Sequence, residues 1–300
     1  MRETIRGYAA AVFESAGRSG TLPTVRGDLL GIARAVNASD DLRTVLTDSV
    51  IPSPTRRAIV IELLETKAER ISVSLVGFTV SAERPPEVPA TLTELVELTE
   101  AEIVRVRSGA LLEVEPPASR QEILERISGY AERVLQELES RSDIDTVEDE
   151  LFQVARILES SRDLRTVLSD GNLTYSGRAA VVDDLFARSL DDATVRLVRY
   201  VIRAGRLRDL VGAINFLTQL AAEERGRRIA EVRSAVPLDD EERTRVGAAL
   251  SRLTDRNVEV RGIIDPSVIG GISVSVGDLI LDGTVRLRVE RLRDLLVKAS

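Results

Sequence analysis

An internal repeat constrains the fold of this chain more than any other feature of its sequence. The segment Asp41–Leu46 recurs as Asp163–Leu168, an offset of 122 residues, and at the same offset Gly7–Ala9 matches Gly129–Ala131. Between 39–64 and 161–186, 12 of 26 positions are identical, where ordinary residue frequencies give about two by chance. The register holds without a gap from residue 5 to residue 98 of the first segment. The chain therefore contains a duplicated domain.

Each copy is predicted to be a chain of short helices. In the first helix, Ile5, Tyr8 and Val12 are spaced by three or four residues, which places them on one buried stripe, and Ile127 and Val134 repeat this pattern in the second copy. Further helices are predicted at roughly 22–36, 53–66, 71–82 and 90–104 in the first copy, and at roughly 146–159, 175–188, 192–204 and 206–226 in the second. The repeated Asp-Leu-Arg-Thr-Val-Leu segment is predicted to be a short turn.

Details of the junctions differ between the copies. Ser53 and Pro54 are predicted to be the N-cap and first residue of a helix. Pro85, Pro86 and Pro89 predict a sharp break between the last two helices of the first copy. A vestigial strand is predicted at about 103–114, because Val106-Arg107-Ser108 resembles Val232-Arg233-Ser234 in the later exit strand.

The last seventy or so residues predict a small α+β module. Strands are predicted at 229–236, 258–264, 272–276 and 279–281, with Gly277-Asp278 as a two-residue hairpin loop. A helix is predicted after Leu238, and a final helix carries Val285, Val289, Leu292 and Leu296 on one face. The predicted fold is mainly α, with two tandem six-helix bundles followed by a β-hairpin and helix domain. The predicted boundaries are 1–110 (copy one), 118–228 (copy two) and 229–300.

Composition excludes several kinds of site. The chain has neither Cys nor His, so it lacks thiolate and imidazole groups for catalysis or metal binding. A net charge of −8 and only 3% aromatic residues argue against a nucleic-acid module. The sequence lacks an apolar run of the ~18 to 20 residues that span a bilayer, and its start is unlike a signal peptide. We expect a protein that does not insert into the membrane.

Two segments that resemble ligand sites have simpler interpretations. Gly270-Gly271 is interpreted as a turn and not as an anion cradle, because no predicted helix begins there. The acidic run Asp239–Glu242 is interpreted as the first turn of a helix, where the helix dipole favours negative charge. Neither lysine follows a phosphate-binding glycine-rich loop. The chain is predicted to be non-catalytic, without a cofactor or metal.

The carboxyl-terminal module resembles the ATP synthase delta subunit family, called the oligomycin-sensitivity-conferring protein in mitochondria. The resemblance rests on Ile264–Asp278 and on Leu281–Val285, where Thr284 replaces the usual Ser. Ala230–Leu238 is similar to the linker strand of the family, and the Tyr130-Ala131 start is similar to its first helix. Residues from about 123 to 300 match the length and order of a whole family member, so copy one is the departure from the pattern.

The resemblance implies a stator function. It implies that copy two holds the amino-terminal helix of an alpha subunit in a groove between its first and fifth helices, and that the carboxyl-terminal module holds a b-type stalk subunit. The chain would then keep the catalytic head of a proton-translocating rotary ATP synthase from turning with the rotor, as a peripheral protein on the cytoplasmic face of the cell membrane. A helical scaffold outside the ATP synthase is the alternative, and it would lack the carboxyl-terminal signature.

Mapped by position, the groove gives a set of candidate partner-binding residues. They are Tyr130, Val134 and Leu135 on the first helix, and Leu197, Arg199, Tyr200, Val201 and Arg203 on the fifth. The alternative for each apolar member is an ordinary core position. The arginines belong to a basic stripe, Arg196, Arg199, Arg203 and Arg206, which predicts either a rim for an acidic partner helix or a solvated face. Copy one has Ser74, Gly77 and Ser81 at the first three of these positions, so we expect it to bind the same ligand less well.

Overall fold

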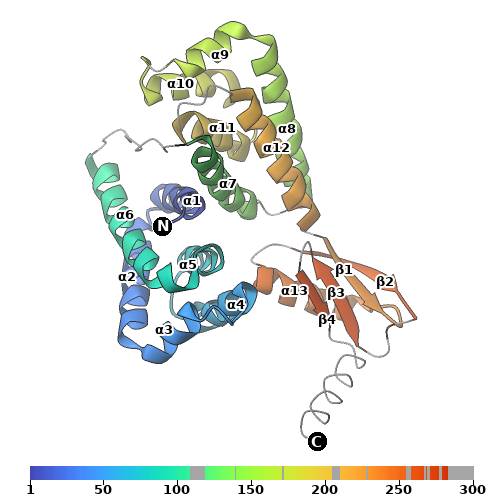
Figure 1. Ribbon diagram of the computed structural model, residues 1–300. Helices are drawn as coiled ribbons and strands as arrows, with labels where there is room; N and C mark the ends of the chain where they lie inside the picture. Colours follow the sequence, from blue (N-terminus) through green and yellow to red (C-terminus); the bar gives the residue numbers. More distant parts are fainter. Residues whose placement is uncertain are drawn as a thin grey trace, which may run out of the picture. The chain divides into compact units, whose positions relative to one another are not determined.

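The computed structural model describes residues 1–108, 119–138, 140–170, 172–204, 210–227, 229–254, 258–266, 268, 271–276 and 279–282 (Figure 1). These residues form two compact units, one of residues 1–137 and 146–220 and the other of residues 138–145 and 221–300. The first unit contains most of both helical copies, and the second contains the sheet. Mainly helical architecture with a small α+β module was the predicted fold class, and it is confirmed.

Copy one forms its own hydrophobic core. Its helices are α1 (Glu3–Ser19), α2 (Leu22–Ala38), α3 (Asp40–Thr47), α4 (Ser53–Leu64), α5 (Arg70–Ala82) and α6 (Val88–Ser108). Ile5, Val12, Leu29, Leu75 and Leu92 are fully buried, and all of them belong to one cluster whose members all lie in this copy. Every member of the cluster comes from the same hundred or so residues, so copy one contributes a hydrophobic core of its own.

Copy two repeats the same order of helices. They are α7 (Arg120–Glu137), α8 (Arg141–Ser160), α9 (Arg162–Ser169), α10 (Tyr175–Phe186), α11 (Asp192–Ala204) and α12 (Leu210–Arg227). The repeat extends to polar contacts at the fifth helix of each copy. Asp28 accepts hydrogen bonds from the Glu69 backbone and the Ser72 hydroxyl at the start of α5. Glu150 accepts the equivalent bonds, from the Asp191 backbone and Thr194.

The segment predicted to be a turn is a short helix in both copies. α3 and α9 each have eight residues, and Ser39 and Ser161 accept hydrogen bonds from the backbone nitrogens of Leu42 and Leu164. The serine caps satisfy backbone donors that would otherwise be free, so even two turns of helix are stable here. The turn prediction was wrong because the hydrophobic pattern does not show these caps.

Three further predictions need correction or fall outside the described residues. Ser53 is the first residue of α4 and does not cap it, since its hydroxyl donates to the Ser81 carbonyl. The vestigial strand is wrong for residues 103–108, because α6 continues through them, and 109–114 lie outside the described residues. The proline-rich break is confirmed as a 3-10 turn, Pro85–Glu87, between α5 and α6.

The second unit contains a four-stranded sheet with the order β2-β1-β3-β4. Its strands are β1 (Ile229–Ser234), β2 (Glu259–Ile264), β3 (Ile272–Val276) and β4 (Leu279–Asp282). β1 pairs with β2 in parallel and with β3 in antiparallel, and β3 and β4 are antiparallel. The predicted loop at 277–278, Gly270 and the final helix after residue 282 lie outside the described residues.

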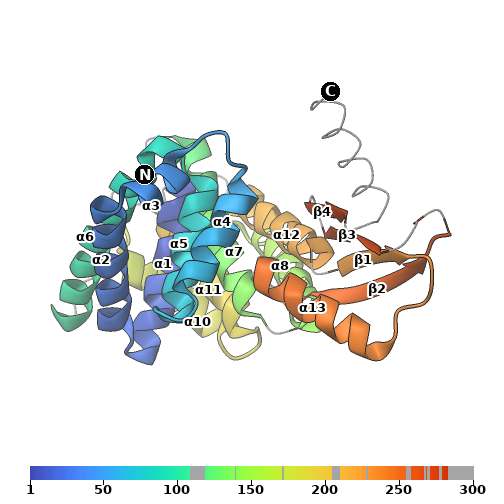
Figure 2. The same cartoon turned by 90° about the horizontal axis from the view of Figure 1, so that it is seen from below.

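Helix α13 (Asp240–Thr254) connects the two parallel strands and packs on the sheet (Figure 2). Leu250 forms a core with Val232, Val258 and Val274. The acidic run lies at the start of this helix, as predicted, with Asp239 just before it and Asp240, Glu241 and Glu242 in its first turn. Asp239 accepts a hydrogen bond from the Glu242 backbone at 2.7 Å, and Glu242 accepts one in return at 3.1 Å, which is a reciprocal capping box.

No helix among the described residues is long and apolar enough to cross a membrane.

Candidate partner-binding site

The residues predicted to form the groove lie together on α7 and α11. The Tyr130 ring stacks on the Tyr200 ring, with centroids 3.7 Å apart and planes 5° from parallel. Val134, Leu135, Leu197 and Val201 are all buried. In copy one, Tyr8 stacks on Phe78 in the same way, with centroids 4.0 Å apart. The stack between the first and fifth helices is therefore a repeated feature, and its residues also serve as core.

The outer side of α7 is covered by α1 of copy one (Figures 1 and 2). The two helices cross at Gly7 and Gly129, where their backbones touch. A Cβ at Gly7 would overlap the Arg126 carbonyl and lie 2.9 Å from the Tyr130 nitrogen. A Cβ at Gly129 would overlap the Thr4 carbonyl and lie 3.0 Å from the Tyr8 nitrogen. Only glycine allows this close approach at both positions.

The tyrosines that follow these glycines exchange equivalent hydrogen bonds across the crossing. Tyr130 donates from its hydroxyl to Glu14 Oε2 at 2.7 Å, and Tyr8 donates to Gln136 Oε1 at 2.7 Å. Residues 14 and 136 are themselves equivalent at the offset of the repeat. Both contacts are thus related by exchange of the two copies, so copy one and copy two pair through the same face of their first helices.

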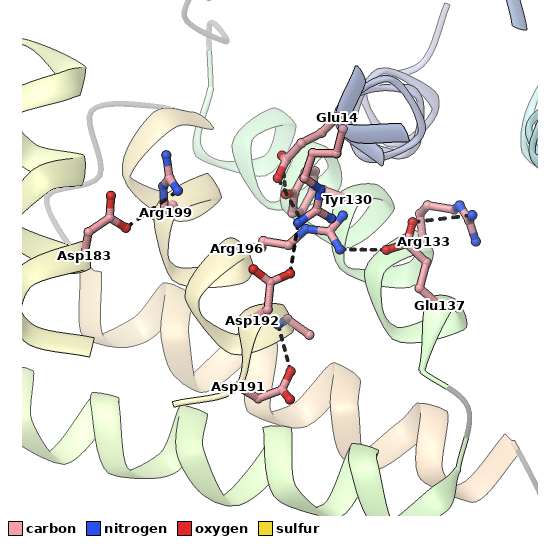
Figure 3. A network of polar contacts seen from close by, with 11 residues as sticks. Glu14, Tyr130, Arg133, Glu137, Asp183, Asp191, Asp192, Arg196 and Arg199 are labelled. Atoms are coloured by element: carbon pink, nitrogen blue, oxygen red, sulfur yellow. Dashed lines mark hydrogen bonds and ion pairs between the residues drawn. The ribbon is translucent and has the colours of Figure 1, made fainter. Parts of the chain in front are cut away.

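Arg196 of α11 completes the contact on the side of copy two (Figure 3). Its Nε lies 3.3 Å from Glu14 Oε1, and its Nη1 lies 2.6 Å from Glu137 Oε2. The Arg196 side chain is only 6% exposed, whereas the Glu14 and Glu137 side chains are 34% and 20% exposed, so the guanidinium is buried and its two acidic partners are partly exposed. The alternative of a fully solvated arginine stripe is wrong at this position.

Burial and charge shift the ionisation of this network. Burial raises the pKa of Tyr130 well above its usual range, and the neighbouring Glu14 carboxylate raises it further. Burial also raises the pKa of Tyr200 to about 12. For Arg196, burial acts to lower the pKa, but Tyr130, Glu137 and Glu14 outweigh it and raise the pKa above its ordinary value. Both tyrosines are consequently neutral and Arg196 is charged at physiological pH.

The other two predicted arginines lie on the more exposed flank of α11. Arg199 Nη1 is 3.6 Å from Asp183 of α10, and its side chain is 43% exposed. Arg203 places its guanidinium 5.9 Å from the centre of the Tyr200 ring. Arg206 lies outside the described residues. In copy one, Gly77 replaces Arg199, and a Cβ added there would lie 3.4 Å from the side chain of Ile61, the counterpart of Asp183. The charged flank is therefore a property of copy two.

Four members of this site were not predicted from the sequence: Gly7, Glu14, Gly129 and Glu137. The repeated Gly-Tyr pair was the available signal, because a glycine inside a helix at the same place in both copies suggests close helix packing. Within the part of the chain that the structure describes, no cluster of three or more acidic residues is arranged to hold a metal ion.

The fold and this contact define a class of protein: a duplicated helical bundle, joined to an α+β module, in which the first helices of the two copies pack on each other. A family model described as ATP synthase delta (OSCP) subunit matches residues 5–109 and 127–296. The chain belongs to this family, and its members are structural, peripheral-stalk subunits of ATP synthase, a membrane-associated complex.

Individual relatives agree with this assignment. The chain is 30% identical over 263 residues to ATP synthase subunit delta of Streptomyces coelicolor, covering 88% of this chain and 84% of the relative. It is 31% identical over 266 residues to the subunit delta of Beutenbergia cavernae, covering 88% and 86%. The subunit delta of Streptomyces griseus is 41% identical over 147 residues, which span 49% of this chain and 54% of the relative.

Proposed function

We propose that this subunit joins the catalytic head of the ATP synthase to its stalk by binding an amino-terminal alpha-subunit helix on copy two and a b-type subunit on the carboxyl-terminal module. One observation above all supports the first part. The α7 and α11 face already receives a helix, α1, through buried tyrosines and a buried arginine. A face with this chemistry has what helix recognition requires, namely apolar anchors and a charged rim.

A partner can make its first contact only with the side chains of the α7 and α11 face that are exposed to solvent. Tyr130, Val134, Leu135, Leu197, Tyr200 and Val201 are buried while α1 is in place. Arg199 and Arg203 are more accessible. We therefore propose that an acidic partner helix first meets the two arginines, and reaches the tyrosine stack only where α1 is displaced. The function of the subunit is mechanical: durable contacts of the order of 1,600 Å² in total resist torque.

A peptide titration tests this proposal. A fluorescent peptide with the sequence of the alpha-subunit amino terminus from the same organism is titrated with the whole chain. Charge reversal of Arg199 and Arg203 to Glu is expected to weaken binding at least tenfold. Arg156→Glu, on an exposed arginine of α8 in the same copy, is the matched control and is expected to leave the affinity unchanged. Failure of the wild-type chain to bind would refute the alpha-subunit assignment.

The two copies should differ in their affinity for the alpha-subunit peptide. Copy one lacks the arginines, with Ser74, Gly77 and Ser81 at positions equivalent to Arg196, Arg199 and Arg203. We expect a chain with Arg199→Gly and Arg203→Ser, which gives copy two the residues of copy one, to bind the peptide as weakly as the charge-reversed chain. Binding at the wild-type level would show that the arginine flank is not part of the contact. For the stalk, recovery of the chain with b-type subunits from solubilised membranes is the corresponding test.

A further inference from the structure

We propose that Glu14 and Arg196 make copy one and copy two select each other, so that unlike copies pair within one chain and like copies of neighbouring chains do not. This inference concerns the surface between the copies and does not depend on the identity of any external partner. Most contacts across this surface are repeated with the two copies exchanged, and a few are not.

Most of the interface gives no basis for selectivity. Gly7 and Gly129 allow the same close approach, and the tyrosines after them form the same hydrogen bond. Arg126 pairs with Glu3, and Glu125 occupies the position in copy two that Glu3 occupies in copy one, so two copy-two faces would keep this ion pair, whereas two copy-one faces would place Glu3 opposite Thr4. A second copy two could therefore supply nearly every contact that copy one makes. Duplicated domains with such faces are prone to pair wrongly between chains.

The repeat is broken where charge is buried. Glu14 corresponds to Gln136, and Arg196 corresponds to Ser74. The unlike pair brings Glu14 to Arg196, at 3.3 Å. A pair of two copy-two faces would put Gln136 in place of Glu14, and Arg196 would lose one of its two carboxylates. A pair of two copy-one faces would put Glu14 opposite Ser74, which leaves this partly exposed carboxylate, 34% exposed in the unlike pair, without its cation.

A second ion pair at the rim acts in the same direction. Arg18 Nη1 lies 2.9 Å from Asp192 Oδ2, and the residue equivalent to Asp192 in copy one is Arg70. Two copy-one faces would thus bring arginines together. Because Arg18 and Asp192 are both well exposed, this contact contributes little. Selectivity comes mainly from the pair between Glu14 and the buried Arg196, where the wrong combination loses a charge partner.

An exchange experiment tests the selectivity. The receiver is the whole chain with Gly7→Leu, which blocks the crossing and frees copy two from its own copy one. The probe is a tagged fragment of residues 1–108, which contains all members of one hydrophobic core cluster. We expect the receiver to capture the wild-type fragment and the wild-type chain to capture at least tenfold less. A fragment with Glu14→Arg should bind the receiver at least tenfold more weakly than the wild-type fragment.

Two controls separate selectivity from general damage. A fragment with Glu62→Gln, which changes an exposed acid on α4, should bind as well as wild type. A receiver that also carries Arg196→Glu should reverse the order and prefer the Glu14→Arg fragment. Circular dichroism of each fragment establishes that it is folded, and sedimentation shows whether the receiver pairs with itself.

Two results would overturn the proposal. The first is equal binding of the wild-type and Glu14→Arg fragments to the Gly7→Leu receiver. The second is self-association of the receiver as tight as its binding of the fragment, since like copies would then pair as well as unlike ones.

Discussion

Substitution of Gly7 by Ala tests the contact on which the pairing of the two copies depends. The added methyl group would overlap the Arg126 carbonyl, so the two backbones must separate by roughly 1 Å or more to reach a normal contact distance. Such a shift would break or lengthen the two 2.7 Å hydrogen bonds from Tyr8 and Tyr130. A bond to a neutral group contributes about 1 kcal/mol, and a bond to a carboxylate about 2 kcal/mol.

These losses are partly offset by a gain in helix propensity. Ala is favoured over Gly by about 1 kcal/mol inside a helix. We therefore expect Gly7→Ala to lower the free energy of unfolding by about 2 kcal/mol, measured by urea titration with circular dichroism. Gly17→Ala is the matched control in the same helix, since a Cβ there meets nothing within 4 Å. It should raise the free energy of unfolding by about 0.5 to 1 kcal/mol.

A chain with both Gly7→Ala and Gly129→Ala gives a second test of the crossing, through the additivity of the two changes in unfolding free energy. Once Gly7→Ala has separated the helices, Gly129→Ala at the same crossing should add little, so the two effects should be strongly non-additive. If Gly7→Ala were as stable as the wild type, or if the two substitutions were additive, the close crossing of α1 and α7 would be refuted.

Three further predictions follow from the contacts of copy two. Burial raises the pKa of Tyr200 to about 12, above the unfolded value of about 10. The folded chain therefore holds the Tyr200 proton more tightly, so the free energy of unfolding is unaffected by Tyr200 below pH 10 and falls as the pH rises from 10 to 12. Tyr200→Phe should make this fall smaller by up to about 3 kcal/mol. Glu150→Ala removes the acceptor for the Asp191 backbone and the Thr194 hydroxyl and should cost about 2 kcal/mol in thermal unfolding. Ser161→Ala removes the cap of α9 and should cost about 1 kcal/mol, with no change in far-ultraviolet helix content beyond the loss of one short helix.

The sequence predicted much of the fold because the repeat could be checked against itself. Stripes such as Ile5, Tyr8 and Val12 give one helix, and their recurrence in copy two gives the same helix again. The sheet strands were predicted from β-branched runs and their turns. The short helices α3 and α9 were missed, since their stability comes from serine caps and tertiary contacts that a hydrophobic pattern does not show.

The pairing of the copies could not be predicted from the same pattern. On α1 and α7, Tyr8 and Tyr130 fit the stripe of a self-contained bundle, and nothing in their spacing says that the hydroxyl ends reach another domain. Arg196 and Arg199 belong to the same periodic stripe, but Arg196 is buried and Arg199 is exposed. This difference depends on which elements pack against α11, and the sequence pattern does not show that. Periodicity identifies a face of a helix, whereas the occupant of that face is set by tertiary structure.

The glycine crossing also limits how this gene could have diverged after its duplication. A duplicated segment is ordinarily free to change in one copy while the other keeps the ancestral role. Here Gly7 lies against the backbone of Arg126 and Tyr130, and Gly129 lies against the backbone of Thr4 and Tyr8. A larger residue at either position would disturb both halves at once. The two segments can drift apart elsewhere along their length, but at this point they must be inherited as a matched set.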